Sequence, residues 1–310
     1  MLKFYKSVNN TIVQTDTLEP GCWVSAVAPT ETEISALEEN LGIDRDFIRS
    51  ALDEEESSRI ESEEGQTLII LDYPVAEKAD EDEAISYNTM PMGIILTETN
   101  VVTVCLKDNI IVEDFAQGVV KGVQTQFKTR FIFYMLLRIA GKYLQYLKQI
   151  DKLSSYVEAQ LRVSMKNKEL LQLLSLQKSL VYFSTSLKST ETVLEKIHRG
   201  RVIKLYEEDE DLLEDVLVEV KQGIEMSSIY SHIISGTTEA FAGIISNNLN
   251  IVMKVLTVIT IVMSVPNMVF GFYGMNVADL PVPTTWFALL ISAVLAASVA
   301  IIITRNKFFK

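Results

Sequence analysis

Cysteine, histidine and clustered basic residues are scarce in this sequence, and their scarcity excludes several classes of protein. The two cysteines, Cys22 and Cys105, lie far apart without a CxxC spacing, so we expect small buried side chains in a reducing compartment. The two histidines, His198 and His232, are isolated, which argues against a zinc-protease or histidine-rich metal site. With 28 basic against 41 acidic residues, the net charge of −13 argues against a general nucleic-acid-binding protein.

Signals for secretion and for nucleotide binding are also missing. The N-terminal residues contain no apolar run followed by a small-residue cleavage site, so we expect no signal peptide and a cytosolic acidic part. The chain has neither a P-loop nor a Rossmann glycine pattern, so ATP-driven pumping is not expected. We expect no covalent chemistry, and therefore a protein that is not an enzyme.

Charge is distributed unevenly along the 310 residues. From Asn247 to the end there are four basic residues and a single acid, Asp279. The first 246 residues therefore hold 24 of the 28 basic and 40 of the 41 acidic residues. A strongly acidic part followed by a nearly uncharged part predicts a two-part membrane protein.

The uncharged part contains two long apolar segments. Ile251–Phe272 carries one charge, Lys254, and Trp286–Ile303 carries none. At 1.5 Å per residue each covers roughly 27–33 Å, enough to cross the hydrocarbon core of a bilayer. We therefore predict a first span at about 250–272, an outer loop at 273–285 and a second span at 286–304. The basic tail 305–310 places both termini on the cytoplasmic side.

Polar and small residues follow one side of the first span. On a helical wheel they fall within an arc of about 120° and the opposite side is apolar. We call this set the polar stripe; it consists of Asn250, Thr257, Thr260, Ser264, Asn267, Gly271 and Gly274. Because polar groups are costly in lipid, the stripe must face protein or water. It fits helix–helix packing or a pore lining, and its length favours the pore.

Two spans from one chain cannot enclose a water-filled path, so a pore requires an oligomer. The first span would line it, with Met253 and Leu256 forming an apolar ring that gates by dewetting. The second span would face lipid, and its small residues would allow close packing. The loop is too short for a re-entrant pore helix and no TVGYG filter is present, which excludes a potassium-channel design.

The stripe ends at Tyr273-Gly274-Met275-Asn276, and here the sequence resembles the CorA family of divalent-cation transporters. The GMN tripeptide at the outer end of the first of two C-terminal spans is the signature of that family. The resemblance is gap-free from about Asn247 to Pro281 and looser upstream. It implies a homopentamer that transports Mg²⁺, with Co²⁺ or Ni²⁺ as poorer substitutes and no organic cofactor.

The resemblance also implies roles for individual residues. Gly274, Met275 and Asn276 would form the selective outer entrance, Asn250 its inner counterpart, and Asp279 would attract cations to the mouth. Mg²⁺ sheds its water reluctantly, so neutral carbonyl oxygens at this entrance suit the hydrated ion. A ring of carboxylates would hold the ion too tightly for release.

The cytosolic part divides into an N-terminal α/β domain (1–107), a long-helix region (108–200) and a stalk helix (201–272) that runs into the first span. Strands are expected at 22–28, 66–73, 92–97 and 101–107. Short helices should begin at the Thr30–Glu33 capping box and at Asp44. Long helices are expected at 128–166 and 168–198, and a third from near Tyr206 without a break before the membrane.

Three acidic clusters lie in the cytosolic part, at 53–64, 80–83 and 207–215. Taken alone, each is most simply a solvated charged face. In the CorA family, however, Mg²⁺ bound between subunits by a stalk aspartate and a loop acid holds the channel closed. Counting back from Asn250 places the stalk aspartate at Asp215 and another stalk acid at Glu239. The loop partner would be one of the acids at 80–83, with the candidates Asp80, Asp82 and Glu83.

We therefore predict a pentameric Mg²⁺ channel of the inner or plasma membrane, gated by cytosolic Mg²⁺. Its partners would be copies of itself, membrane lipid and divalent cations, and no nucleic acid. Two alternatives stay open: a transporter of Zn²⁺, Co²⁺ or Ni²⁺, and a membrane-tethered Mg²⁺ sensor or scaffold that conducts nothing. A tethered scaffold would leave Asn276 and Asn250 dispensable.

Overall fold

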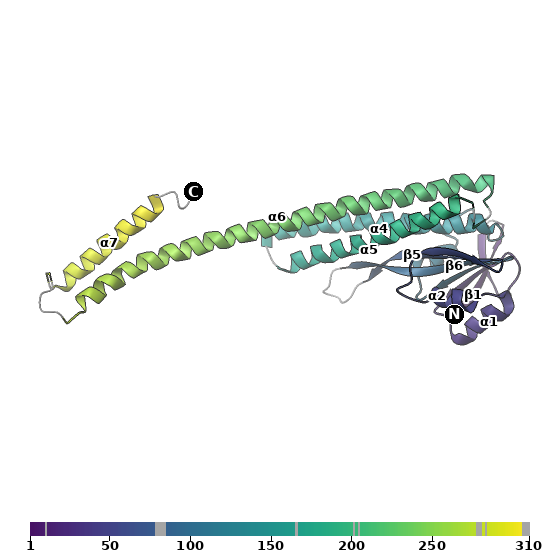
Figure 1. The fold of residues 1–310 in the computed structure, drawn as a ribbon, viewed down its shortest axis with the longest axis horizontal. Helices are drawn as coiled ribbons and strands as arrows, with labels where there is room; N and C mark the ends of the chain where they lie inside the picture. Colours follow the sequence, from purple (N-terminus) through teal and green to yellow (C-terminus); the bar gives the residue numbers. More distant parts are fainter. Residues whose placement is uncertain are drawn as a thin grey trace. The chain divides into compact units, whose positions relative to one another are not determined.

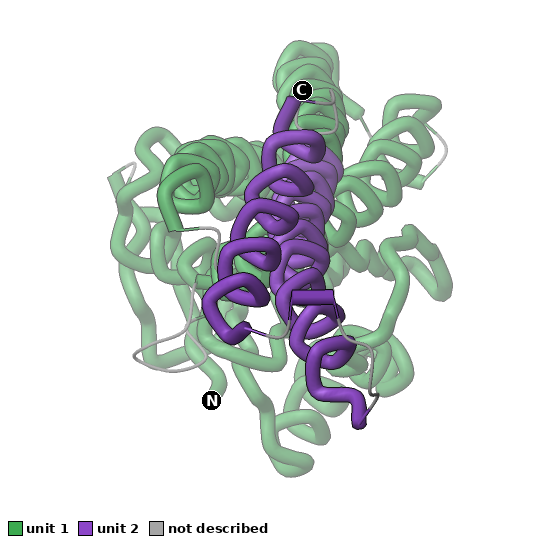
Figure 2. The backbone as a smooth tube through the Cα atoms, turned by 90° about the vertical axis from the view of Figure 1, so that its left-hand side faces the viewer, with its two compact units in different colours: residues 1–238 green, residues 239–310 purple. Residues whose placement is uncertain are grey.

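The computed structural model describes residues 1–9, 11–77, 85–164, 167–200, 202–203, 205–276, 281–282 and 284–305. The chain forms two compact units, Met1–Thr238 (unit 1) and Glu239–Lys310 (unit 2), which Figure 2 shows in green and purple. Among the described residues, unit 1 contains the sheet, five helices and the first part of α6 (Glu207–Tyr273), whereas unit 2 contains the rest of α6 and α7 (Thr285–Arg305).

Unit 1 is built on a mixed seven-stranded sheet with the order β2-β1-β3-β7-β6-β5-β4. Strands β1, β5 and β6 of this sheet are labelled in Figure 1. Strands β3 and β7 pair in parallel, and the other neighbours are antiparallel. The strands are β1 (Leu2–Val8), β2 (Thr11–Thr15), β3 (Trp23–Val27), β4 (Arg59–Glu63), β5 (Gln66–Glu77), β6 (Ser86–Leu96) and β7 (Val101–Cys105).

The four strands expected from the sequence are confirmed as β3, β5, β6 and β7, but β5 and β6 are longer than expected. Their pairing continues as far as Glu77 opposite Ser86. Pro91 lies inside β6. Because proline seldom occurs within a strand, the residues that precede the predicted start of β6 were not expected to belong to it. Strands β1, β2 and β4 have no counterpart in the sequence prediction, since polar residues alternate through them and much of their surface stays exposed.

Helices α1 (Glu31–Leu41) and α2 (Arg45–Ser50) pack on one face of the sheet and complete a hydrophobic core with β3, β5, β6 and β7. The predicted capping box is confirmed at the start of α1, where Thr30 and Glu33 satisfy each other's backbone groups. Asp44 caps α2 as predicted, by accepting a hydrogen bond from the Asp46 amide at 2.8 Å. Local capping therefore fixes where both helices begin.

Helices α3 (Ile110–Ala116), α4 (Lys128–Ser164) and α5 (Asn167–His198) contribute to the opposite side of the sheet. The rings of Trp23, Phe115 and Phe131 meet there with centroids 5.5–6.2 Å apart. Cys22 and Cys105 are free and buried, and burial raises the pKa of Cys105 to about 12. The expectation that both cysteine side chains are buried is therefore confirmed.

Helix α6 (Glu207–Tyr273) is the third long helix expected from the sequence, and α4 and α5 also begin and end within two residues of their predicted bounds. In unit 1, α6 packs against α5, where Ser227 Oγ donates to the Leu180 carbonyl at 2.7 Å. A Cβ atom at Gly223 would lie 3.0 Å from the side chain of Leu187. Gly223 thus permits a close approach of the two helices.

Candidate ion-conducting site

Two helices are long and apolar enough to cross a membrane: α6 and α7 (Thr285–Arg305). Their most apolar 18-residue windows are 0% and 11% buried, whereas a core helix of a soluble protein is mostly buried. Both predicted spans are therefore confirmed as helices whose apolar side chains are left without a protein core. By length and composition both helices fit the hydrocarbon core of a bilayer.

The polar stripe lies on α6 and remains largely exposed within unit 2. Asn250, Thr257, Thr260, Asn267 and Gly271 are exposed, and Ser264 is half-buried. At 100° per residue the half-buried apolar positions of α6 within unit 2 lie on the opposite side of the helix; they are Val258, Val262, Val265, Pro266, Val269 and Tyr273. The stripe thus points away from the face that unit 2 itself covers.

Hydroxyl groups of the stripe are held in a defined direction by their own helix. The hydroxyls of Thr257 and Thr260 donate to the carbonyls four residues earlier, each at 2.8 Å. Ser264 donates to the carbonyl three residues earlier, also at 2.8 Å. Because each proton is used within the helix, the remaining lone pairs are acceptors for an outside donor. Water molecules around a cation are such donors.

The two gate candidates, Met253 and Leu256, lie on α6 in the same arc as the stripe. Their side chains are 52% and 55% exposed, so neither is used to pack unit 2. An apolar ring formed by copies of these residues would narrow a water-filled path and favour its dewetting.

The GMN tripeptide follows directly after the last turn of α6. The Gly274 amide donates to the Phe270 carbonyl at 2.9 Å, and the Met275 amide donates to the Phe272 carbonyl at 3.3 Å. A Cβ atom at Gly274 would lie only 3.1 Å from the Phe270 oxygen, so a side chain here would crowd this helix end. Met275 and Asn276 are exposed just beyond it.

Tyr273 holds the start of the outer loop, a role that the sequence reasoning did not assign. Its hydroxyl donates to the Pro281 carbonyl at 3.0 Å, which joins the end of α6 to the far side of the loop. A cavity of about 450 Å³ lies beside it, lined by residues including Phe270, Gly274 and Ala288. The sequence feature that could have indicated this role is a tyrosine, an aromatic residue with a polar hydroxyl group, at the end of a predicted membrane span.

Some predicted site residues lie outside the part of the chain that the structure describes. They are the outer-mouth acid Asp279 and the candidate regulatory acids Asp80, Asp82 and Glu83. Asp215 and Glu239 are described, and both are exposed on α6 without an ion pair to another described residue. Among the described residues no three metal-ligating side chains gather within one chain.

The acidic cluster 207–215 is only partly a solvated face, which corrects the simplest interpretation of it. Asp209 is 3% exposed, and its carboxylate accepts a hydrogen bond from Arg130 Nε at 2.7 Å. Glu208 accepts one from the same guanidinium at 2.9 Å. These bonds hold the pKa of Arg130 above its ordinary value and fasten the start of α6 to α4. Asp215, two turns later, has no such partner in the described part of the chain.

Comparisons with known proteins agree with this arrangement. The family model described as CorA-like Mg²⁺ transporter protein matches residues 19–305. The cobalt/magnesium transport protein CorA of Methanocaldococcus jannaschii is 26% identical over 268 residues, which cover 84% of this chain and 81% of that protein.

Solved structures share the fold over nearly the whole chain. The complete structure of the CorA magnesium transporter from Methanocaldococcus jannaschii gives a TM-score of 0.81 at 22% identity, covering 98% of this chain and 96% of the other. The full-length CmaX protein gives 0.73 at 18% identity, covering 99% and 98%. Since the family match covers most of the sequence, the chain belongs to the family of CorA-like Mg²⁺ transporter proteins, whose members are membrane transporters of divalent cations rather than enzymes.

Proposed function

We propose that this protein transports Mg²⁺ across the cell membrane through a homopentameric pore lined by the polar stripe. The observation that supports this most is the direction of the stripe. It lies opposite the face of α6 that unit 2 covers, and it leads to Gly274, Met275 and Asn276. A polar helix face that its own hairpin does not cover must contact water or protein inside a membrane. A symmetric ring of identical spans around a water-filled pore provides both contacts.

The chemistry of the stripe suits a hydrated divalent cation. Its oriented hydroxyls and the amides of Asn250 and Asn267 offer neutral oxygen acceptors along the helix. Mg²⁺ keeps its water shell and would meet these oxygens through that water. Because no carboxylate lies on the stripe, the ion would be held weakly enough to leave. Asn276 would form the selective ring at the outer end, with Asp279 nearby.

Uptake into liposomes tests the proposed function directly. Vesicles that contain the purified full-length protein and a Mg²⁺-sensitive dye should fill with Mg²⁺ when it is added outside, and protein-free vesicles should not. Zn²⁺, Co²⁺ and Ni²⁺ are added in parallel with dyes of their own. If Zn²⁺ is taken up faster than Mg²⁺, the proposed substrate Mg²⁺ is wrong and Zn²⁺ takes its place. If no ion is taken up even when the vesicles contain no Mg²⁺, the result favours a non-conducting sensor.

Removing two hydroxyls from the stripe should slow conduction. The double variant Thr257→Val, Thr260→Val removes ten oxygen acceptors from the five subunits together and keeps the shape of the helix. We expect Mg²⁺ uptake to fall by at least about tenfold, since each lost hydrogen bond is worth about 0.5–1.5 kcal/mol. Stopped-flow dye fluorescence measures the rate.

Thr304→Val is the matched control for the stripe variant. Its hydroxyl also donates to a carbonyl four residues earlier, at 2.8 Å, but it lies on α7. We expect uptake by this variant to equal that of the native protein. Equal losses in the two variants would show that the hydroxyls act on helix stability and not on the ion.

We further propose that cytosolic Mg²⁺ closes the pore by binding between subunits through Asp215, with help from Glu239 and an acid of the segment 80–83. The carboxylate of Asp215 supports this, because it is exposed and has no ion pair among the described residues, whereas Asp209 on the same helix is already neutralised by Arg130. Bound Mg²⁺ would hold acidic neighbours together while it is abundant. When Mg²⁺ falls, the emptied sites would repel one another and loosen the ring.

Asp215→Asn should make the pore less sensitive to internal Mg²⁺. We expect the internal concentration that halves uptake to rise by about tenfold, which corresponds to about 1.4 kcal/mol of lost binding. The measurement is uptake into vesicles preloaded with a series of Mg²⁺ concentrations. Glu210→Gln removes an exposed acid from another side of α6 and should leave the inhibition curve unchanged. Identical curves for native protein and Asp215→Asn would remove Asp215 from the regulatory site.

A further inference from the structure

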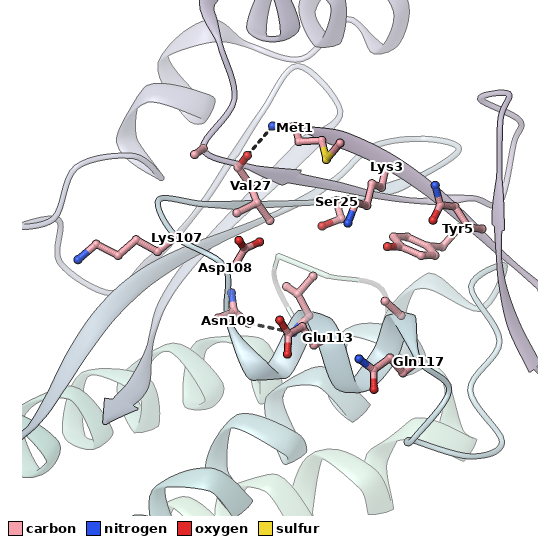
Figure 3. A pocket seen from close by; sticks show the side chains of 14 residues that line it. Met1, Lys3, Tyr5, Ser25, Val27, Lys107, Asp108, Asn109, Glu113 and Gln117 are labelled. Carbon is pink, nitrogen blue, oxygen red and sulfur yellow. Dashed lines mark hydrogen bonds between the residues drawn. The ribbon is translucent and has the colours of Figure 1, made fainter. Parts of the chain in front are cut away.

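A cavity of about 830 Å³ lies in unit 1, between the first strands of the sheet and α3 (Figure 3). Side chains of β1, β2 and β3 form one wall, and α3 with the residues that follow β7 forms the other. Its volume lies within the roughly 300–1,000 Å³ that small-molecule sites occupy. Neither the proposed pore nor its regulatory acids use this cavity.

Two largely buried residues, Tyr5 and Ser25, present to the cavity hydroxyl groups that have no hydrogen-bond partner among the described residues. Tyr5 is 5% exposed and Ser25 is 2% exposed, and both line the wall formed by the strands. The ring of Tyr5 stacks on Trp23 with centroids 4.7 Å apart, which fixes the direction of its hydroxyl. Burial raises the pKa of Tyr5, so the hydroxyl keeps its proton and can donate. Both hydroxyls are accessible from the cavity, so a ligand there can accept hydrogen bonds from them.

Charged groups approach the cavity from both walls. Figure 3 shows Lys3 on the strand wall, with Glu113 on α3 and Asp108 after β7 on the other side. None of these three side chains forms an ion pair within the described part of the chain. Lys107 also lines the cavity and lies 3.8 Å from Glu77. The walls therefore offer free charges of opposite sign to one ligand.

The balance of charge restricts the class of ligand. The Met1 ammonium group at the cavity is paired with Glu33 at 3.2 Å, which leaves two lysines against two acids. This balance does not suit a polyanion such as a nucleotide, which would need an excess of positive charge. The two lysines also disfavour a bare metal ion, and no three metal-ligating side chains gather among the described residues. A molecule that itself carries one negative and one positive group matches both walls.

We propose that this cavity binds a small zwitterion of the amino-acid class. Its carboxylate would lie toward Lys3 and accept hydrogen bonds from the hydroxyls of Tyr5 and Ser25. Its ammonium group would lie toward Glu113 and Asp108. Charge-assisted hydrogen bonds at both ends would orient the ligand, and the volume of the cavity leaves room for its side chain.

Thermal unfolding of the full-length protein in detergent tests this proposal without reference to transport. Each of the twenty protein amino acids is added in turn at millimolar concentration, and the unfolding midpoint is followed by tryptophan fluorescence. We expect at least one of them to raise the midpoint by about 2 °C or more, because a ligand that binds only the folded state stabilises it. No shift with any of the twenty would overturn the proposal.

Two variants locate the binding. Lys3→Gln and Glu113→Gln should each weaken the affinity for the active amino acid at least tenfold, as measured by titration calorimetry. Lys6→Gln is the matched control, because Lys6 lies on the same strand but forms an ion pair with Glu19 at 2.5 Å outside the cavity. Equal affinity in Lys3→Gln and Lys6→Gln would place the ligand elsewhere and refute the site.

Discussion

Asn276→Ala is expected to reduce Mg²⁺ uptake by at least about a hundredfold, close to the level of protein-free vesicles. In the proposed pentamer this change removes five amide oxygens from the outer ring at once. Each oxygen contributes about 0.5–1.5 kcal/mol as a hydrogen-bond acceptor to the water shell of the ion, so their joint loss exceeds about 2.5 kcal/mol. The Asn276 side chain is exposed within the chain, so its loss should not disturb unit 2.

The control for this experiment is Asn247→Ala, which removes the same amide from an exposed position of α6 outside the stripe. Its uptake should equal that of the native protein. Chemical cross-linking checks that both variants assemble as the native protein does. If Asn276→Ala conducts normally, the tripeptide is not a selective entrance, and the tethered-scaffold alternative gains support.

Gly93→Ala is expected to have the largest effect on stability. Gly93 lies on β6 under α2, and a Cβ atom there would be 2.3 Å from the Cβ atom of Ala51. Ala51 is completely buried, and its Cβ is attached directly to the backbone, so it cannot rotate away. Overpacking of this kind costs about 1–3 kcal/mol. We expect the unfolding midpoint of the full-length protein to fall by about 2–12 °C.

A second substitution tests whether this single contact is the cause. Adding Ala51→Gly to Gly93→Ala removes the opposing methyl group and should restore more than half of the lost stability, although glycine at this helix end costs up to about 1 kcal/mol. Gly141→Ala is the control, because nothing lies within 4 Å of a Cβ atom there, in the middle of α4. We expect it to be neutral or slightly stabilising. Failure of the double variant to recover would mean that Gly93 is needed for another reason.

Features that depend on neighbours in the sequence could be predicted without the structure. The starts of α1 and α2 follow from side chains that bond to amides two or three residues away. The long helices follow from a 3.6-residue apolar period that persists over many turns. The two spans follow from length and the near absence of charge, because the bilayer requires little else. The GMN tripeptide likewise indicated the family before any fold was known.

Features that depend on distant partners could not be predicted in this way. Strands β1, β2 and β4 exist because neighbouring strands pair with them, and their own alternation of residues is too weak to reveal it. The sequence does not distinguish Asp209 from its solvated neighbours, because its partner Arg130 lies 79 residues earlier in the chain. The cavity beside α3 likewise joins Lys3 with Glu113.

The sequence by itself determined the membrane hairpin, the polar stripe and its ending at Asn276, since each is a matter of residue type at a helical spacing. Only the tertiary structure decided which side of α6 unit 2 covers, which acids are neutralised, and which hydroxyl groups line the cavity beside α3. The reason is physical. A local pattern is fixed by bonds and spacing along one segment, whereas burial and pairing depend on which other segments pack against it.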